Sequence, residues 1–467
     1  MPHRQSFSEL RTGYGAGRLS PYDVAASALD HAVQVNRRVN AFALLDRERA
    51  LTAAAASAER WQQGCPRSAI DGMPFTVKEF AAVEGWPTRR GSLTTSSTPA
   101  TASSEFVLRL EQAGAVLLGK TRSPEFNWKG VTDSPGYGIT CNPWNSAWTP
   151  GGSSGGCAAA VAAGVVRVSV GSDAGGSVRL PAAFTGTIGL KPTFGRIPVV
   201  PYPSHFSQIA HFGPIGASAA DVDDAMYVLS GAAVGDWTSI TGNARAWAKP
   251  EYAAATLRIG VLSPVHWSEA QGIVRAGMEQ VVALLAGEGF QISEIDLDIA
   301  LATEAGKMLY RLGCEATVRG IDRHEHARLD PGLLAFVRPV TGMSLSDYLG
   351  ALRERDTFAS RMAEIFETID LLILPTAPIT PFEVGHEVPP GWAGDDWLSW
   401  NPYTPAFNLS HHPALSYPVW PDESAVPVGV QLVAPPWRED RLLGLCAWLE
   451  QRCPVRFSPL ADSSVYP

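Results

Sequence analysis

The sequence lacks the cysteine and histidine patterns that hold metal ions. None of its six cysteines forms a Cys-x-x-Cys pair, and no cysteine and histidine residues are spaced as zinc ligands. The cysteines are scattered over the chain, at Cys65, Cys141, Cys157, Cys314, Cys446 and Cys453. A large chain without a secretory signal favours free thiols, and the even number leaves pairing open. We therefore expect no metal ion and no cofactor.

A long hydrophobic run and an excess of basic residues are also missing. The most apolar stretch, residues 158–170, is interrupted by Gly164 and Arg167 and is too short to span a membrane. Residues 1–20 contain no apolar segment typical of a secretory signal. Acidic residues outnumber basic ones, 46 to 37, and the net charge of −9 disfavours nucleic acid or an anionic membrane as a partner. The sequence predicts a cytoplasmic protein that binds neither.

What the sequence does contain is an alternation of strand and helix patterns over 467 residues. Short apolar runs predict strands at 72–77, 115–118, 166–170, 257–262, 370–374 and 428–433. Helical periodicity and capping residues predict helices at 21–39, 51–62, 105–113, 157–163, 270–288, 344–367 and 438–451. This alternation is typical of a layered α/β fold. Because no linker stands out, we expect one large domain, whose segment 235–370 the sequence defines least.

Two clusters of small residues dominate the chain. The first is Pro150-Gly-Gly-Ser-Ser-Gly-Gly156, in a loop-rich stretch from 132 to 156, and the second is the predicted turn Gly171-Ser-Asp-Ala-Gly-Gly-Ser177. Glycines in such density let backbone N–H groups converge on one point without interference from side chains. A serine at the end of such a turn has the ingredients of a nucleophile beside an oxyanion hole. Two such turns indicate a catalytic site more strongly than one.

Two other interpretations of the first cluster are weaker. A phosphate-binding P-loop requires lysine after its last glycine, and Cys157 stands there instead. The residues Gly151 to Gly155 do match Gly-x-Ser-x-Gly, which leaves an α/β-hydrolase-like esterase with Ser153 as nucleophile as an alternative. That elbow must follow a strand, however, and residues 142–150 form a proline-bracketed loop.

Together with the run from Val178 to Gly195, the two clusters resemble the amidase signature family. Segment 72–79 resembles the part of the family that bears a catalytic lysine, and segments 370–375, 408–418 and 427–433 resemble its C-terminal part. The resemblance implies a single domain over 1–467, with a central mixed twisted sheet covered by helices on both faces. It divides the chain into N-terminal helices at about 5–62, a signature core at about 70–220, a variable region at about 235–370, and a C-terminal sheet and helix at about 370–455.

Carried over residue by residue, the resemblance implies a Ser-cisSer-Lys triad of Ser177, Ser153 and Lys78, with a cis peptide bond between Gly152 and Ser153. The oxyanion hole falls on the backbone amides of Ala174, Gly175, Gly176 and Ser177. Supporting roles fall on Ser154, Ser172, Asp173 and Arg179; the last two are expected to pair and brace the turn.

General chemistry, apart from the family resemblance, also supports a triad of two serines and a lysine. A serine hydroxyl is a poor nucleophile unless a base removes its proton, and no histidine stands nearby in sequence. Lysine can serve as the base if burial lowers its pKa toward neutral pH. Ser153 would then pass the proton of Ser177 to Lys78, and the reverse path would protonate the departing amine.

The substrate is less well defined by the sequence. The family builds its acyl pocket from the segment after Lys120 and from late loops, which here are rich in aromatic residues and favour an aryl or bulky apolar substrate. The candidate pocket residues are Phe126, Trp128, Gly130, Val131, Trp400 and Tyr403. Core packing is an equally good explanation of these aromatic residues.

The sequence thus predicts a free-standing amidase, a monomer or homodimer, that acts on small aryl or acyl amides, with some esters and carbamates as further candidate substrates. A second hypothesis is the A subunit of a glutamine-dependent amidotransferase. The run 201–208 disfavours it, because it departs from the Ser-Leu-Asp-Gln type of run in that subunit. A third hypothesis is a binding module without activity, which the complete Lys/Ser/Ser set disfavours.

Overall fold

A computed structural model of the chain describes residues 1–201, 206, 208–239, 247, 256–422 and 426–462. The strands are β1 Phe42–Leu45, β2 Pro74–Lys78, β3 Val116–Thr121, β4 Asp133–Ser134, β5 Gly138–Ile139, β6 Val168–Asp173, β7 Ile188–Lys191, β8 His211–Gly216, β9 Arg258–Leu262, β10 Gln291–Ile295, β11 Leu371–Pro375, β12 Ala414–Val419 and β13 Val428–Val433. The α-helices are α1 Phe7–Gly15, α2 Pro21–Val39, α3 Arg47–Gln62, α4 Glu105–Gln112, α5 Gly155–Ala162, α6 Arg179–Thr185, α7 Ala219–Leu229, α8 Gly272–Gly287, α9 Ala300–Arg319, α10 Pro331–Val337, α11 Leu345–Thr368, α12 Pro405–Leu409 and α13 Glu439–Glu450. Short 3₁₀ helices include η2 Glu125–Asn127, η5 Pro264–Trp267 and η8 Trp397–Trp400.

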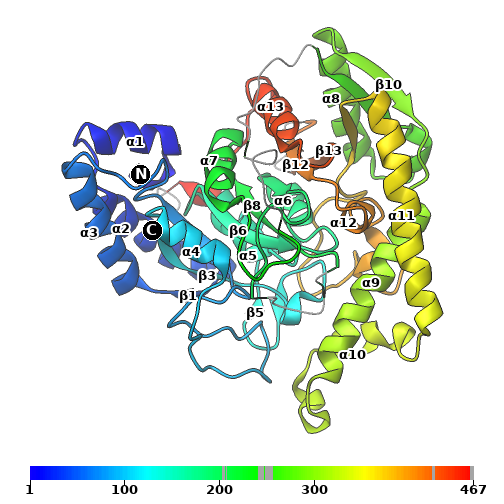
Figure 1. The fold of residues 1–467 in the computed structure, drawn as a ribbon, viewed down its shortest axis with the longest axis horizontal. Helices are drawn as coiled ribbons and strands as arrows, with labels where there is room; N and C mark the ends of the chain where they lie inside the picture. The colour runs from blue at the N-terminus through cyan, green and yellow to red at the C-terminus, as the bar shows by residue number, and fades with distance from the viewer. Residues whose placement is uncertain (202–205, 207, 240–246, 248–255, 423–425, 463–467) are drawn as a thin grey trace.

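One mixed sheet of 11 strands runs through the described residues, in the order β1-β3-β2-β6-β8-β7-β12-β13-β11-β9-β10. The N-terminal helices lie at the β1 end of the molecule and α8 and α11 at the β10 end (Figure 1). Strands β2, β3 and β6 are parallel neighbours, as are β9, β10 and β11, whereas β7, β8, β12 and β13 pair antiparallel. Parallel strands need helical crossovers that cover the sheet, which explains why β2, β3 and β6 are buried almost throughout.

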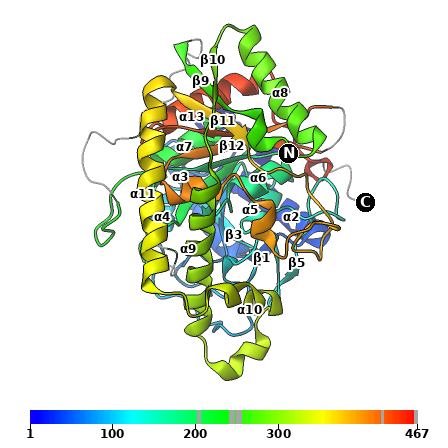
Figure 2. The same cartoon turned by 90° about the vertical axis from the view of Figure 1, so that its right-hand side faces the viewer.

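Helices cover both faces of this sheet. Helices α2, α5 and α6 pack on one face, and α4, α7 and α13 pack on the other. Helices α9 and α11 lie side by side at the flank of the molecule, and α12 packs against α9 (Figure 2). This is the α/β architecture that the sequence predicted, with a mixed sheet covered on both sides.

The predicted elements hold with small shifts at their ends. The strand at 428–433 and the helix at 21–39 are confirmed as β13 and α2. The helix predicted from 51 begins earlier, at Arg47, because the Asp46 side chain caps it by accepting the N–H of Arg49. The turn predicted at 171–176 is wrong in its first half, because β6 continues through Asp173 and pairs with β8. Helices α1, α6, α7, α9, α10 and α12 and strands β1, β4, β5, β7, β8, β10 and β12 were not predicted.

The six cysteines are free, as expected for a large chain of this kind. Within the described ranges, no helix has both the length and the apolar character that crossing a membrane requires.

Candidate active site

The carboxyl end of β2 places Lys78 inside the protein, beside strand β6. These two strands run parallel with Val77 opposite Val170, so the residues that follow in each strand share one edge of the sheet. The Lys78 nitrogen Nζ donates to Ser153 Oγ at 2.6 Å and to Ser172 Oγ at 3.1 Å. Lys78 is 1% exposed, so these two hydroxyls replace water around its amine.

Burial lowers the pKa of Lys78 from 10.5 to about 7, because the interior disfavours the ammonium form. Three groups act in the opposite direction by favouring a positive charge, namely Cys157 on α5, Asp173 on β6 and Glu79 after β2. Burial outweighs them. Near neutral pH, much of Lys78 is therefore a neutral amine that can accept a proton from Ser153.

Ser153 lies in the turn that leads into α5, which begins at Gly155. The peptide bond between Gly152 and Ser153 is cis. A Cβ atom on Gly152 would lie 2.6 Å from the backbone of Val131, so only glycine fits there. Residues 140–152 contain no strand, so Ser153 does not stand on a strand-to-helix elbow. The α/β-hydrolase alternative is therefore wrong.

Ser154 connects the two serine clusters. Its Oγ donates to the carbonyl of Ser172 at 3.2 Å and accepts the Ser172 N–H at 3.3 Å, while its own N–H donates to the carbonyl of Ser177 at 3.1 Å. Ser177 is 3% exposed and precedes α6. Among the described residues, the hydroxyls of Ser153 and Ser177 form no hydrogen bond with each other. Catalytic hydrogen bonds are often long in free enzymes and tighten with substrate.

The backbone amides before Ser177 differ in their availability. In the part of the chain that the structure describes, the N–H groups of Ala174, Gly175 and Ser177 have no acceptor. The Gly176 N–H instead donates to Asp173 Oδ1 at 2.7 Å. The expectation that Gly176 contributes to an oxyanion hole is therefore wrong, because its N–H already donates a hydrogen bond to the Asp173 carboxylate. Three donors remain.

Side chains from a distant loop hold the peptide between Gly175 and Gly176. The Gly175 carbonyl accepts from Asn401 Nδ2 at 2.6 Å and from Thr404 Oγ1 at 2.7 Å. Gly176 has φ +115°, and a Cβ atom there would lie 2.2 Å from Thr404 Oγ1. Only glycine therefore fits at this position, and the N–H directions of the turn are fixed by contacts from outside it.

The expected pair of Asp173 and Arg179 is present and fully buried. Arg179 Nε and Nη2 donate to the two carboxylate oxygens, each at 2.9 Å. Asn408 Nδ2 donates to Asp173 Oδ1 at 2.9 Å, and Arg179 Nη1 donates to Gln431 Oε1 at 2.7 Å. Burial alone would raise the pKa of Asp173, but the Arg179 guanidinium holds it well below its usual value. This network joins the turn to α12 and β13.

Replacing Arg179 with methionine should destabilise the protein by about 3–5 kcal/mol, because it leaves the Asp173 carboxylate buried without its cation. Urea unfolding followed by circular dichroism measures the change. The control is Arg319→Met, which removes a pair with Glu315 whose arginine side chain is 73% exposed, and which should leave the unfolding midpoint nearly unchanged. Equal midpoints for the two variants would show that the buried pair does not brace the fold.

Two of the six residues predicted to line a substrate pocket are fully buried. Trp128 and Trp400 are 0% exposed, and their indole N–H groups donate to Asp330 Oδ2 and to the Glu387 carbonyl. Neither ring can touch a substrate in this arrangement, so that prediction is wrong for both; dense packing accounts for them instead.

Among the other pocket candidates, Gly130 and Val131 contact the first serine turn. Phe126 is half-buried, with φ +47°. Gly130 and Val131 are buried, and their backbone lies against Gly152. Tyr403 is buried, and its hydroxyl donates to the His266 carbonyl at 3.4 Å.

Two aromatic side chains that the sequence analysis did not assign to the site lie over Gly175. A Cβ atom at Gly175 would be 3.3 Å from Tyr310 Cδ2 and 3.5 Å from Trp397 Cη2. Trp397 belongs to the late loops whose aromatic residues indicated a pocket, which was a partial signal. Tyr310 lies on α9, inside the segment that the sequence defined least, and no motif marked it.

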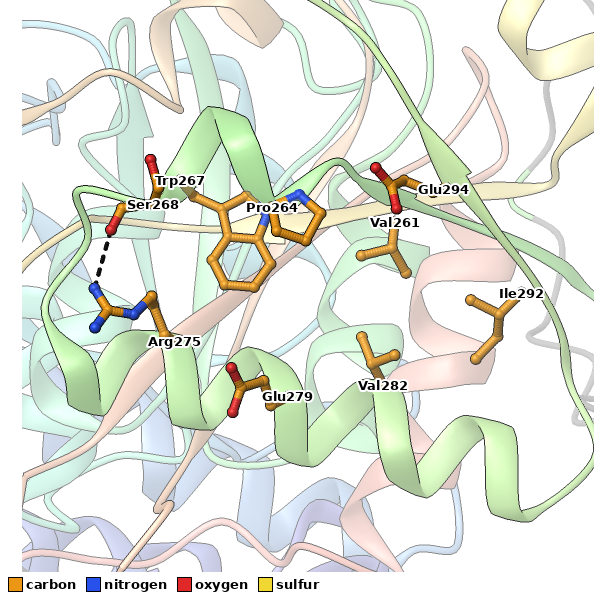
Figure 3. A pocket seen from close by; sticks show the side chains of 9 residues that line it. All are labelled: Val261, Pro264, Trp267, Ser268, Arg275, Glu279, Val282, Ile292 and Glu294. Atoms are coloured by element: carbon orange, nitrogen blue, oxygen red, sulfur yellow. Dashed lines mark hydrogen bonds between the residues drawn. The ribbon is translucent and has the colours of Figure 1, made fainter.

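A separate pocket of about 440 Å³ lies between η5, α8 and the outer strands β9 and β10 (Figure 3). Trp267 and Pro264 form one wall, and Arg275 is tied to the backbone carbonyls of Ser268 and Ala270. None of its lining residues belongs to the serine turns, so the site described above does not include it.

The Amidase family matches residues 23–443, which include β2 and both serine clusters. The chain belongs to the amidase family. It is accordingly an amidohydrolase, an enzyme that hydrolyses amide C–N bonds.

Similar proteins include the A subunit of the glutamyl-tRNA(Gln) amidotransferase of Acinetobacter baylyi (strain ATCC 33305 / BD413 / ADP1), which is 30% identical over 96% of each chain. A bacterial aryl acylamidase of the amidase signature family has a solved structure that is 28% identical, with a TM-score of 0.86 over 97% of each chain. The 6-aminohexanoate cyclic dimer hydrolase is 27% identical, with a TM-score of 0.86 over 98% of this chain and 99% of the other. This amidase-family protein therefore resembles both one component of a larger enzyme and amidases of other kinds.

Proposed function

We propose that this amidase-family protein acts alone, as a monomer or homodimer, and hydrolyses small aryl or acyl amides through an acyl-enzyme on Ser177. The observation that carries the proposal is the buried contact between Lys78, whose pKa is lowered to about 7, and Ser153, beside the turn that ends at Ser177. A neutral amine and an adjacent hydroxyl form a path by which a second hydroxyl can lose its proton.

The proposed reaction begins with attack of Ser177 Oγ on the amide carbonyl carbon. The Ser177 proton passes to Ser153 as Ser153 gives its own proton to neutral Lys78. The oxygen of the tetrahedral intermediate accepts from the amides of Ala174, Gly175 and Ser177, and one such donor contributes about 3 kcal/mol. Collapse of the intermediate breaks the C–N bond, and the proton returns through Ser153 to the departing nitrogen.

A water molecule then resolves the acyl-enzyme. It attacks the ester of Ser177 while Lys78 and Ser153 remove its proton along the same path, and the acid product leaves with Ser177 restored. Esters and carbamates present a carbonyl oxygen to the same three donors, so we include them among the substrates.

Two observations favour aryl substrates. A similar solved structure is that of an aryl acylamidase, as reported above. In addition, the ring of Phe126, on the segment after β3, is only half-buried and leaves part of its surface for a ligand. Flat aromatic groups pack well against edges and faces of such rings.

A second candidate function is the A subunit of a glutamine-dependent amidotransferase, because curated relatives with that name are about 30% identical over nearly the whole chain. The run 201–208, which departs from that subunit's pattern, lies largely outside the described residues, which omit 202–205 and 207. The sequence difference alone therefore supports the free-standing amidase here.

A substrate panel tests the choice between these functions. The purified chain, with no other protein added, should hydrolyse p-nitroanilides and other aryl amides, and more slowly primary alkyl amides, when rates are compared over amides, anilides, esters and carbamates of varied acyl length. Ammonia release from glutamine is measured in parallel. Turnover of glutamine alone, with no turnover of any anilide or ester, would reject the proposal in favour of the amidotransferase component.

A further inference from the structure

Helix α8 packs mainly against β13, and a pocket lies between this helix and the outer strands. The buried residues of α8 include Val274 and Gly277. A Cβ atom on Gly277 would lie 2.4 Å from Val428 Cγ2, so the helix is seated closely on β13. The pocket of about 440 Å³ is bounded by a neighbouring face of α8, by β9 and β10, and by η5 (Figure 3).

Residue spacing in the helix and in the strands explains what lines this pocket. Glu279 and Val282 are one helical turn apart, so they share one face of α8. On the sheet, Glu294 of β10 stands opposite Val261 of β9, and Ile292 lies on the same face as Glu294 because side chains alternate along a strand. The pocket therefore has an apolar lining, with one carboxylate on the helix side and another on the strand side.

Hydrogen bonds hold the walls of the pocket in place. Trp267 is 5% exposed, and its indole N–H donates to the Leu262 carbonyl at 2.8 Å. Arg275 Nη1 donates to the carbonyls of Ser268 and Ala270 at 3.0 and 2.5 Å, which ties the start of α8 to the segment after η5. A pocket with fixed walls needs little ordering when a ligand enters, which favours binding.

The charges of the lining favour a cation over an anion. Among the described residues, Glu279 forms no hydrogen bond or ion pair, and Glu294 accepts from Ser263 Oγ. Arg275 is the one basic residue of the lining, and in the described part of the chain it pairs with neither carboxylate. Figure 3 shows Arg275 beside Ser268, at the opposite end of the pocket from Glu294. An anion would therefore meet two carboxylates and one guanidinium that is already engaged.

We propose that this pocket binds a small organic ammonium ion with an apolar body, at a site separate from the serine turns. The apolar body packs on Val261, Trp267 and Val282, and the ammonium faces the carboxylates of Glu279 and Glu294. An amidohydrolase that cleaves an alkyl amide releases an amine, which is protonated at neutral pH, so its own product belongs to this class of ligand.

Three probes with the same body and different charge test the inference, namely phenylbutylammonium, phenylbutanol and phenylbutyrate. Isothermal titration calorimetry of the purified chain at low salt should show the ammonium binding about tenfold more tightly than the alcohol, and the carboxylate more weakly than either. At about 1 M salt the ammonium and the alcohol should bind alike, because the rim charges are screened. Equal affinity of ammonium and alcohol at low salt, or tighter binding of the carboxylate, would overturn the proposal.

Glutamine variants locate the charge effect. Glu279→Gln should weaken binding of phenylbutylammonium about fivefold and leave the alcohol unchanged, and Glu294→Gln should act in the same direction. The control is Glu288→Gln, which removes an equal charge just after α8, where the carboxylate pairs with Arg452 at 3.2 Å. This control should keep the parent affinity. Equal losses in Glu279→Gln and Glu288→Gln would show a general charge effect and reject the pocket.

A substitution that fills the pocket separates it from the serine turns. Val282 is half-buried, so Val282→Trp should occupy the space and weaken both the ammonium and the alcohol at least about tenfold. Parent affinity in Val282→Trp would place the ligand elsewhere and contradict the assignment. Glu279→Gln keeps the shape of the pocket, so its result decides the proposal even if Val282→Trp lowers the melting temperature. Binding is measured without turnover, so failure of the proposed function would leave these results unaffected.

Discussion

Replacing Ser177 with alanine should reduce hydrolysis of a p-nitroanilide by about four orders of magnitude or more. The substitution removes the oxygen that forms the proposed acyl-enzyme, while the donors at Ala174 and Gly175 and the Lys78–Ser153 contact remain. Loss of a serine nucleophile leaves only the catalysis that binding and the oxyanion hole supply. Initial rates and fluorophosphonate labelling measure the effect, and the variant should not label at all.

A second buried serine provides the control for this substitution. Ser416 on β12 shares a hydrogen bond with Thr376 at 2.9 Å, and within the described ranges no hydrogen bond connects it with the serine turns. Ser416→Ala should keep the parent kcat within a few fold and label normally. Turnover of Ser177→Ala within tenfold of the parent would reject Ser177 as the nucleophile, whatever the control does.

Replacing Lys78 with methionine should lower kcat/KM by about three orders of magnitude, because the apolar side chain fills the same space but cannot accept a proton. In the parent protein, kcat/KM should rise with pH through about 7, where Lys78 loses its proton, and level off above. The variant should lose that rise. Rates on an ester measured from acidic to alkaline pH give both results.

Glu450 supplies the control for the pH profile. Burial raises the pKa of this carboxyl to about 7, so its titration falls in the same range as that of Lys78. It lies on α13 and accepts the N–H of Ala219 on α7, which places it apart from the serine turns. Glu450→Gln should leave the rise of activity unchanged. If Glu450→Gln abolishes the rise and Lys78→Met retains it, Lys78 is not the base.

Lys78→Met, which lowers activity, should at the same time stabilise the protein at acidic pH. The pKa of Lys78 is about 7 in the folded protein and rises to its ordinary value of 10.5 when the chain unfolds, so between these values the unfolded chain binds more protons. The contribution of Lys78 to stability therefore rises with pH over that range and is least favourable below it, where a charged ammonium is buried. Lys78→Met should melt at a higher temperature than the parent at about pH 6, and the difference should shrink as the pH rises. A lower melting temperature at acidic pH would contradict the buried charge.

Local signals in the sequence were enough for much of the fold. The proline after Ser20 and the apolar run at 428–433 predicted α2 and β13 with their observed bounds, because helix starts and buried strands have local chemical causes. The segment 235–370 holds α8, α9, α10 and α11, of which only α8 and α11 were predicted. Helix α9 was missed because no capping residue marks its start: its N-cap residue is Ile299, which makes no side-chain hydrogen bond there, although Gly320 directly follows its last residue.

Burial and hydrogen-bond partners were the parts of the site that the sequence could not supply. Trp400 was expected in a pocket and is packed inside, while Tyr310 was not expected at all and lies over Gly175. The amide of Gly176 looked like those of its neighbours, yet the structure gives its hydrogen to Asp173. Each of these outcomes depends on how the folded chain packs around the residue, so no local pattern encodes them.

By itself, the sequence determined the residue types of the site, because two glycine-rich turns that both contain serines and a lysine at a strand end allow few other chemistries. The tertiary structure decided which of these atoms meet. Parallel pairing of β2 with β6 brings Lys78 to Ser172 across 94 residues, and the turn before α5 sets Ser153 against the same amine. Burial of that amine, which lowers its pKa, follows from helices packed on both faces of the sheet, and only the folded chain creates that environment.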